Sequence, residues 1–322
     1  MTISPAFDLT GARVWVAGQT GMVGSALVRR LASEPIAGIL GRTSADLDLR
    51  RQDEVQAFVH AERPDVLLLA AARVGGIQAN LIRPAEFLYD NLMIAANCLE
   101  AARVGGVRRA VVLGSSCVYP REAPQPIPED ALLTGPLEPT NEGYAVAKIA
   151  GLKLAETYRE QYGFDAIGLL PSNLYGPHDD FELETAHVLP ALLRKIHLAK
   201  QEGRDEVEIW GTGTPRREFL HVDDLADATI HALKHHRDGR FLNVGTGVDV
   251  PIRILAQLIA DVVGWQGSFR FDRSMPDGTP RKLLDVSSLG SLGWSPSIGL
   301  KEGITGTYRW FLEHHPAGQM AP

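Results

Sequence analysis

Tyr144 and Lys148 occupy the stretch YAVAK, in a segment with the apolar periodicity of a helix. A spacing of four residues places both side chains on one helix face. A free phenol has a pKa of about 10, and a nearby ammonium lowers that pKa by favouring the phenolate. The pair therefore predicts acid–base chemistry at a carbonyl, although a lone YxxxK also occurs in helices that carry no chemistry.

Ser115 and Cys117 follow a short apolar strand in the stretch GSSCVYP. The Ser115 hydroxyl can bond to a substrate carbonyl. In an extended segment positions i and i+2 face the same way, so both side chains are expected in the crevice beyond the carboxyl end of the strand. A thiol titrates near about 8.5, so Cys117 is a candidate base. The alternative is a small buried apolar residue, which is the role expected for Cys98 in its apolar helix.

Gly18, Gly21 and Gly24 form the stretch GQTGMVG between a predicted strand and a predicted helix. Gly18 permits a tight turn, Gly21 lets the backbone approach a pyrophosphate, and Gly24 lets the helix pack closely on the strand. The helix N-terminus offers free N–H groups to an anion. The spacing is GxxGxxG instead of the standard GxGxxG, so the strand–turn–helix context carries the prediction of a dinucleotide site, which includes Met22 and Val23.

Arg42 stands near the end of the second predicted strand, in GILGRTSADLDL. Sites that prefer NAD usually place an acidic residue there, which binds the ribose 2′-hydroxyl. No acid lies beside Arg42, and a cation suits a 2′-phosphate. The sequence therefore favours NADP, with a solvated surface arginine as the alternative.

Predicted strands and helices alternate along the first 175 residues. The strands are continuously apolar, which indicates a parallel sheet covered by helices on both faces. We therefore predict an α/β fold with a Rossmann-type doubly wound parallel sheet. The predicted strands are residues 12–18, 36–40, 64–72, 107–116 and 165–170, and the predicted helices are 22–33, 53–62, 84–106 and 144–163.

The alternation ends near residue 175, where short apolar segments appear among Gly- and Pro-containing loops. A chain of 322 residues exceeds one typical core. We expect residues 1–175 to form the NADP-binding Rossmann domain, with returning segments near 218–247, and residues 176–322 to form mainly a smaller substrate domain. The proline-rich stretch 120–139 is predicted to be a structured loop over a cleft.

The composition excludes several classes of protein. A net charge of −7 argues against a nucleic-acid surface, and no apolar run approaches the ~20 residues of a membrane span. The N-terminal residues lack the basic start and apolar core of a secretion signal. Two cysteines make neither a disulfide framework nor a metal-ligand set. We therefore expect a cytoplasmic protein with no metal and no nucleic-acid or membrane partner.

Eight stretches resemble, in order, the motifs of the extended short-chain dehydrogenase/reductase family. The family implies a Rossmann domain, a smaller nucleotide-sugar domain and a Ser/Thr–Tyr–Lys triad, which here is Ser115, Tyr144 and Lys148. Lys148 would also bond to the nicotinamide ribose. The matching stretches are residues 69–80, 113–120, 137–154, 171–181, 187–195, 210–224, 243–249 and 276–286.

The resemblance is closest to family members that act on GDP-4-keto-6-deoxy-D-mannose, invert C3 and C5, and reduce C4 with NADPH. The 4-keto group acidifies the hydrogens on C3 and C5, and inversion requires a base on one face of the sugar and an acid on the other. The triad alone does not supply both. The resemblance implies that Cys117 is the base and His187, with an imidazole that titrates near about 6.5, is the acid. Alone, His187 would suit a helix start or a surface position.

The resemblance also implies the residues that contact both ligands. Each of them alone would suit a solvated or structural role. Position 195 is Lys where Arg is common in the family, so a phosphate contact survives without bidentate geometry. Further expected cofactor contacts are Leu113, Gly114, Pro171, Asn173, Leu174 and His187, and expected contacts to the GDP-sugar are Lys195, Trp210, Arg217, Asp277 and Lys282.

Other functions remain open at this point. In this family two long helices, here near 84–104 and 144–162, pair across a homodimer, but an apolar core stripe has the same pattern. A 4-epimerase would recycle bound NAD, and a 4,6-dehydratase typically has an acid near Ser115, where this chain has Ser116 and Cys117. A redox-sensing binding protein without catalysis is a further alternative, against which the intact triad argues.

Overall fold

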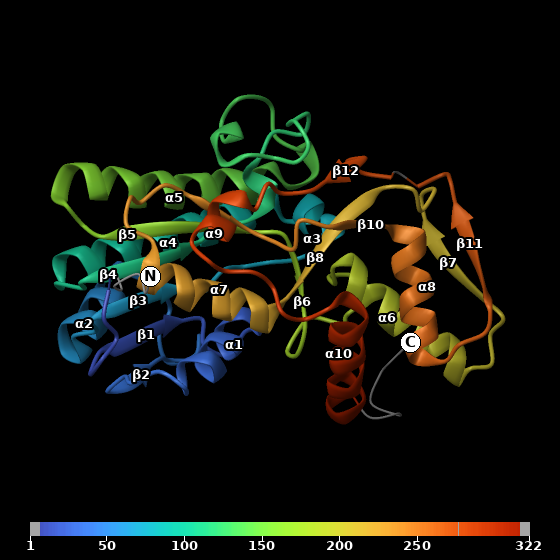
Figure 1. Cartoon of the computed structure of the whole chain (residues 1–322), viewed down its shortest axis with the longest axis horizontal. Helices are drawn as coiled ribbons and strands as arrows, with labels where there is room; N and C mark the ends of the chain where they lie inside the picture. The colour runs from blue at the N-terminus through green and yellow to red at the C-terminus, as the bar shows by residue number, and fades with distance from the viewer. Residues whose placement is uncertain (1–6, 276, 316–322) are drawn as a thin grey trace.

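A parallel sheet of six strands forms the centre of the computed structural model, which describes residues 7–275 and 277–315 (Figure 1). The strand order is β2-β1-β3-β4-β5-β9, and each neighbouring pair is parallel. The order reverses between β1 and β3, which is where ligands bind in open α/β sheets. The strands are β1 (Arg13–Ala17), β2 (Gly38–Leu40), β3 (Val66–Leu69), β4 (Arg109–Leu113), β5 (Ala166–Pro171) and β9 (Leu242–Val244).

Helices cover both faces of this sheet. Along β1 the side chains alternate, because Val14 and Val16 pack into one apolar cluster while Trp15 and Ala17 pack into the other. α1 and α7 lie together on the first face, and α2, α4 and α5 lie on the second. These helices are α1 (Met22–Leu31), α2 (Gln52–Glu62), α4 (Pro84–Val104), α5 (Glu142–Tyr162) and α7 (Val222–His235). The predicted α/β fold with a Rossmann-type sheet is confirmed.

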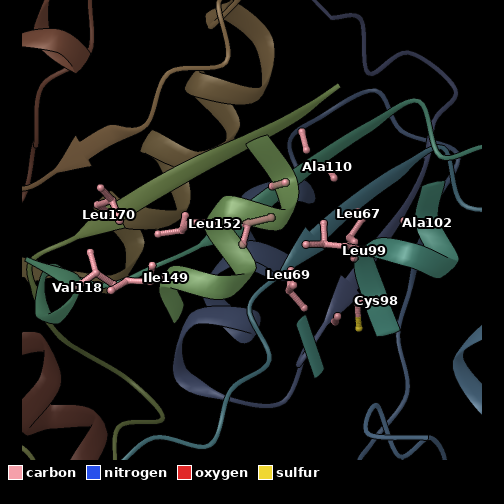
Figure 2. Close-up of a cluster of buried hydrophobic side chains, with 14 of the residues drawn as sticks. Leu67, Leu69, Cys98, Leu99, Ala102, Ala110, Val118, Ile149, Leu152 and Leu170 are labelled. Carbon is pink, nitrogen blue, oxygen red and sulfur yellow. The ribbon is translucent and has the colours of Figure 1, made fainter. Parts of the chain in front are cut away.

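Cys98 lies in the second of these clusters, between α4 and the sheet (Figure 2). It is fully buried, beside Leu67, Leu69 and Leu99 from β3 and α4. Burial raises the pKa of its thiol far above the usual range. The prediction that Cys98 packs in the core is therefore confirmed.

The later part of the chain builds a second group of elements around its own apolar cluster. β7 and β11 form a two-stranded parallel sheet, and β8 pairs with β6, β10 and β12. β8 therefore joins segments that are far apart in the sequence. These elements are β6 (Asn173–Tyr175), α6 (Val188–Gln201), β7 (Glu206–Trp210), β8 (Arg216–His221), β10 (Asp249–Pro251), α8 (Ile252–Val263), β11 (Ser268–Asp272), β12 (Arg281–Lys282) and α10 (Leu300–His314).

Residues 120–139 form a structured loop, as the sequence predicted. The loop is tied to the segment after β12, because the Ile127 N–H donates to the Leu283 carbonyl at 2.8 Å and the Asp285 N–H donates to the Ile127 carbonyl at 2.9 Å. The remaining short helices are α3 (Ile77–Ile82), α9 (Ser287–Ser291) and the 3₁₀ turns η1 (Ser116–Val118), η2 (Glu129–Ala131) and η3 (Pro139–Asn141). Within residues 7–275 and 277–315, none of the helices has the length and apolar character needed to span a membrane.

Candidate active site

The turn between β1 and α1 depends on two glycines. Gly18 has φ +89°, and a Cβ there would lie 2.7 Å from the backbone of Ala71, which follows β3. A Cβ on Gly24 would lie 1.9 Å from the Gly18 carbonyl oxygen. Gly21 begins α1 as its N-cap residue. The turn thus leaves bare backbone and a helix N-terminus at the point where the strand order reverses.

A cavity of about 510 Å³ opens beside this turn. Gly18, Gly21 and Arg42 are among the residues that line it. The Arg42 guanidinium is half-exposed, lies 2.7 Å from the Glu62 carboxylate and sits 5.3 Å from the centroid of the Phe58 ring. Arg42 is therefore held at the cavity by an ion pair and a ring contact.

Ser115 and Cys117 lie directly after β4, but the segment is not extended as the sequence predicted. Ser115 itself is extended, and the 3₁₀ turn η1 begins at the next residue. The turn forms because the Ser115 hydroxyl accepts a hydrogen bond from the Cys117 N–H at 3.3 Å. The same bond keeps the two residues adjacent, so the predicted proximity survives with a different backbone geometry.

Tyr144 and Lys148 extend from the first turns of α5 toward the end of β4. The Lys148 ammonium donates to the Leu113 carbonyl at 2.9 Å and lies 5.7 Å from the centroid of the Tyr144 ring. Burial lowers the pKa of Lys148 to about 8. Burial also raises the pKa of Tyr144, and the Cys117 thiolate adds to that rise. The prediction of a lowered Tyr144 pKa is therefore wrong, because desolvation of the phenolate dominates.

The Cys117 thiol is buried next to several of these groups. Burial raises its pKa, while the Lys282 ammonium, the bond from Ser115 and the Lys148 ammonium lower it. Lys282 comes from β12, far along the chain, and its own pKa is lowered by burial and raised by the Cys117 thiolate. The structure thus brings Lys282, predicted only as a contact of the GDP-sugar, into the electrostatic field of Cys117.

His187 immediately precedes α6 and is exposed. Desolvation of the ring by the surrounding protein lowers the pKa of the His187 imidazole, and the negative charge of Asp180 raises it. An exposed imidazole with a nearby carboxylate can exchange protons with solvent and with a bound molecule.

Residues predicted to contact the GDP-sugar lie on the later elements. The Lys195 ammonium of α6 lies 5.5 Å from the centroid of the Trp210 ring, which is 53% exposed at the end of β7. Arg217 lies on β8, beside the loop that contains Asp277. The Asp277 carboxylate accepts bonds from the Thr212 N–H at 2.6 Å and from the Thr212 hydroxyl at 2.9 Å. Asp277 therefore already joins two loops.

Further residues predicted to contact the cofactor lie at the ends of β4 and β5 and on β6. Leu113, Gly114 and Pro171 are buried there. Asn173 and Leu174 follow on β6, and the Asn173 amide donates to the Glu218 carbonyl at 2.8 Å. This bond fixes the Asn173 side chain to β8.

Residues 14–245 match the NAD dependent epimerase/dehydratase family. The chain belongs to this family. Among curated relatives, "Probable GDP-L-fucose synthase 1" of Oryza sativa subsp. japonica is 55% identical over 305 residues, which cover 94% of this chain and 93% of that protein. GDP-L-fucose synthase of Escherichia coli (strain K12) is 51% identical over 311 residues, with 94% and 97% coverage. A solved structure of a GDP-L-fucose synthetase from Naegleria fowleri bound to NADP matches with a TM-score of 0.89 at 28% identity and 99% coverage of both chains.

The cavity of this NAD dependent epimerase/dehydratase family member fits NADP. Added Cβ atoms at Gly18 and Gly24 would clash with backbone, so glycine at both positions lets the turn, the residues after β3 and α1 pack closely, and the α1 N-terminus lies at the cavity, where it suits a pyrophosphate. Arg42 lines the same cavity and offers a cation to a 2′-phosphate.

Sequence reasoning missed two further arginines that line the cavity of this family member, Arg50 and Arg73. Both bind the Asp90 carboxylate, at 3.2 and 2.9 Å. No spacing pattern connects these residues, because they come from the segment before α2, the segment after β3 and the second turn of α4. Only the fold brings them together.

Glu218 is a third residue whose role was not predicted from the sequence. Its carboxylate is fully buried on β8 and accepts bonds from the N–H groups of Thr246, Gly247 and Leu284, at 2.6, 2.7 and 3.0 Å. It thereby joins the loop after β9 to the segment after Lys282. The available signal was a charged residue inside the apolar stretch REFLHV, since an acid is buried there only with hydrogen-bond partners.

Proposed function

We propose that this chain is an NADPH-dependent 3,5-epimerase and 4-reductase that converts GDP-4-keto-6-deoxy-D-mannose to GDP-L-fucose. The observation that carries the proposal is the position of Cys117 beside the set of Ser115, Tyr144 and Lys148. A plain reductase needs only the latter three residues, whereas an epimerising reductase needs an additional base. The high identity to proteins named GDP-L-fucose synthase, over nearly the whole chain, supports the same substrate.

The reduction step uses the three residues at the end of β4 and the start of α5. Bound NADPH supplies the hydride to C4 of the sugar. The Ser115 hydroxyl donates a hydrogen bond to the C4 oxygen, and the Tyr144 phenol donates the proton that completes the alcohol. The raised pKa of Tyr144 keeps the phenol protonated and ready to donate at neutral pH. Lys148 is bound to the Leu113 carbonyl and remains largely protonated below its pKa of about 8.

The epimerisation steps use Cys117 and His187. The Cys117 thiolate removes a proton from C3 or C5, which the 4-keto group has acidified, and the electrons pass into the enolate. The His187 imidazolium delivers a proton to the opposite face of the same carbon. The Lys282 and Lys148 ammonium groups stabilise the thiolate and partly offset burial, which still raises the pKa of Cys117 overall.

The substrate side of the site supplies cations and one aromatic face for the GDP moiety. Lys195 and Arg217 are suited to the diphosphate, and the exposed Trp210 ring is suited to stacking on the base. Asp277 orients the Thr212 loop next to Trp210 and retains acceptor capacity for a hydroxyl of the substrate.

We further infer which parts of the chain bind the cofactor and which bind the substrate. Residues 1–175, with the returning segments near 218–247, hold NADP, and residues 176–322 mainly hold the GDP-sugar. The ends of these ranges, residues 1–6 and 316–322, lie outside the described residues. A homodimer through α4 and α5 and a cytoplasmic location complete the proposal.

A coupled spectroscopic and product assay tests this function. Purified protein is mixed with NADPH and GDP-4-keto-6-deoxy-D-mannose, NADPH absorbance is followed, and the product is compared with authentic GDP-L-fucose. We expect oxidation of NADPH with formation of GDP-L-fucose, and little turnover of the UDP-linked analogue. Absence of NADPH oxidation, or a product that keeps the D configuration at C5, would contradict the proposal.

A further inference from the structure

The loop that carries His187 is short and tightly closed. It runs from Asp180 to His187, the residue before α6. A bond from the Ala186 N–H to the Glu182 carbonyl at 2.7 Å closes its last turn, and His187 is the next residue after Ala186. The position of the imidazole therefore depends on how this loop is held.

Asp180 holds the loop from within. One carboxylate oxygen accepts a hydrogen bond from the Glu182 N–H at 2.8 Å, and the other accepts one from the Thr185 hydroxyl. A single side chain thus spans the loop from its start to the second residue before His187. Loss of these bonds would release the backbone that places the imidazole.

The Gly75–Gly76 corner after β3 fixes the same loop from outside. The Gly76 N–H donates to the Thr185 carbonyl at 2.7 Å, and a Cβ on Gly76 would lie 2.8 Å from the Ala186 carbonyl oxygen. The Asn80 amide donates to the carbonyls of both glycines, at 2.9 and 3.0 Å. The loop is therefore hydrogen-bonded to the segment after β3, which is itself held by Asn80.

The charge that acts on the His187 imidazole comes from Asp180. The surrounding protein lowers the pKa of His187, and the Asp180 carboxylate raises it. Within residues 7–275 and 277–315, the Gly75–Gly76 corner brings no titratable side chain to this contact. Loss of the Asp180 charge would therefore lower the pKa of His187, because desolvation by the surrounding protein would no longer be opposed.

Other charged groups near the loop have different partners. Arg194 of α6 donates to the Phe181 carbonyl at 3.0 Å and to the Glu182 carboxylate at 2.8 Å. Burial raises the pKa of Asp179 to about 7, and of the two smaller effects the bond from the Asp180 N–H lowers this pKa while the Asp180 charge raises it. Neither group acts on the His187 imidazole in the way that Asp180 does.

We propose that Asp180 is a positioning residue for His187, because its carboxylate bonds to both the start and the end of the loop that leads into the imidazole. The inference rests on the proposed function, in which His187 is the acid of epimerisation. The Asp180 charge also favours the imidazolium, which is the form that can deliver a proton.

Three variants separate charge from shape. Asp180→Asn keeps the size of the side chain and removes its charge, whereas Thr185→Val keeps the charge and removes one bond of the loop. Glu184→Gln is the matched control. Glu184 is an exposed carboxylate in the same loop, and its charge is not among the effects that shift the pKa of His187.

The first readout is an NMR titration of imidazole signals in histidine-labelled protein, which requires no turnover. The His187 signal is assigned by its loss in His187→Gln. We expect the midpoint of His187 to shift to lower pH in Asp180→Asn and to stay unchanged in Glu184→Gln. An unchanged midpoint in folded Asp180→Asn would overturn the inference and leave the proposed function intact.

The second readout is deuterium incorporation at C3 and C5 as a function of pH. In Asp180→Asn the fall of exchange on the alkaline side should begin at lower pH, with KM for NADPH unchanged. In Thr185→Val, deuterium exchange should fall at all pH values, and the pH at which exchange declines on the alkaline side should change little. If exchange in Asp180→Asn fell by the same factor at every pH, Asp180 would have only a structural role, and the inference would be overturned. Wild-type protein that exchanges neither proton would instead overturn the proposed function.

Discussion

The ammonium groups of Lys148 and Lys282 and the phenol of Tyr144 lie in the electrostatic field of Cys117, and the Cys117 thiolate raises the pKa of each of them. Lys282 and Lys148 favour its thiolate, and that thiolate raises the pKa of both Tyr144 and Lys148. The proposed base of epimerisation and the proposed acid of reduction are therefore electrostatically coupled. A thiolate at Cys117 keeps the Tyr144 proton in place, which suits a sequence in which ring inversion comes before reduction.

Cys117→Ser tests the base directly. A serine hydroxyl is a far weaker acid than a thiol, so deuterium uptake at C3 and C5 should fall by about 10²–10⁴-fold. Binding of GDP and NADPH, measured by calorimetry, should be unchanged. Cys98→Ala is the matched control: it should lose stability, because Cys98 is fully buried, yet keep exchange per folded molecule. Exchange that persists in Cys117→Ser would remove this residue from the mechanism.

The pKa of Lys148 predicts how the reduction depends on pH. Burial lowers this pKa to about 8, so the ammonium is lost as the pH rises through that value. kcat/KM for NADPH, which reports the free enzyme, should therefore fall above about pH 8. Lys148→Met should have a lower kcat/KM at every pH, and its kcat/KM should not fall above pH 8. A wild-type profile that stays flat to pH 10 would contradict the prediction.

Single residues were well predicted where a motif defines them and poorly predicted where the environment decides. The order of motifs identified Ser115, Tyr144 and Lys148, and the structure brings them together around the end of β4. The desolvation of Tyr144 could not be predicted from the sequence, because the atoms that bury this side chain come from separate segments. The extended geometry at Cys117 was wrong for a local reason, since the Ser115 hydroxyl caps a 3₁₀ turn.

At the scale of elements, the approach of α1 to β1 controls access to the pyrophosphate site. Helix and strand can come this close only because Gly24 has no side chain, and a Cβ there would overlap the Gly18 carbonyl. The helix N-terminus then faces the carboxyl end of the sheet.

Gly24→Ala should displace α1 from this turn. Overpacking of this kind typically lowers the free energy of unfolding by about 1–3 kcal/mol. We expect a loss of that size in urea denaturation, together with a clearly weaker affinity for NADPH in a fluorescence titration. Gly38→Ala on β2 is the control, because nothing lies within 4 Å of its added Cβ and its φ is not positive. Equal NADPH affinity in both variants would speak against the role of Gly24.

The sequence predicted the elements of the first 175 residues closely and those of the later part less completely. α6 was not predicted as a helix, although its buried residues Leu189, Leu192, Leu193 and Ile196 have helical spacing. β8 pairs with three short strands, and such pairings carry no local signal. The buried Glu218 that joins these loops became visible only when its three N–H partners were in place.

At the scale of the whole molecule, α4 and α5 pack against each other and expose apolar side chains on the surface. Tyr89 and Leu92 of α4 are 59% and 38% exposed, and Val146 of α5 is 42% exposed. Tyr89 and Leu92 are three residues apart and so share one helix face. These residues are the candidates for the contact between two copies of the chain.

A double variant, Tyr89→Glu with Leu92→Glu, tests the proposed homodimer. Wild-type protein should have twice the chain mass of 35.0 kDa in light scattering, and the variant should have the mass of one chain because charges would be buried at the interface. Leu312→Glu, an exposed leucine on α10, is the control and should leave the mass unchanged. A monomeric wild type, or a variant that remains dimeric, would contradict this arrangement.

The most direct test of the combined epimerase and reductase is one turnover experiment in deuterated water. Wild-type protein is supplied with GDP-4-keto-6-deoxy-D-mannose and NADPH, and the sugar product is examined by NMR and mass spectrometry. We predict deuterium at both C3 and C5 and one NADP⁺ formed for each sugar reduced. A product reduced at C4 without deuterium at either carbon would contradict the claim, because it would show a reductase that does not epimerise.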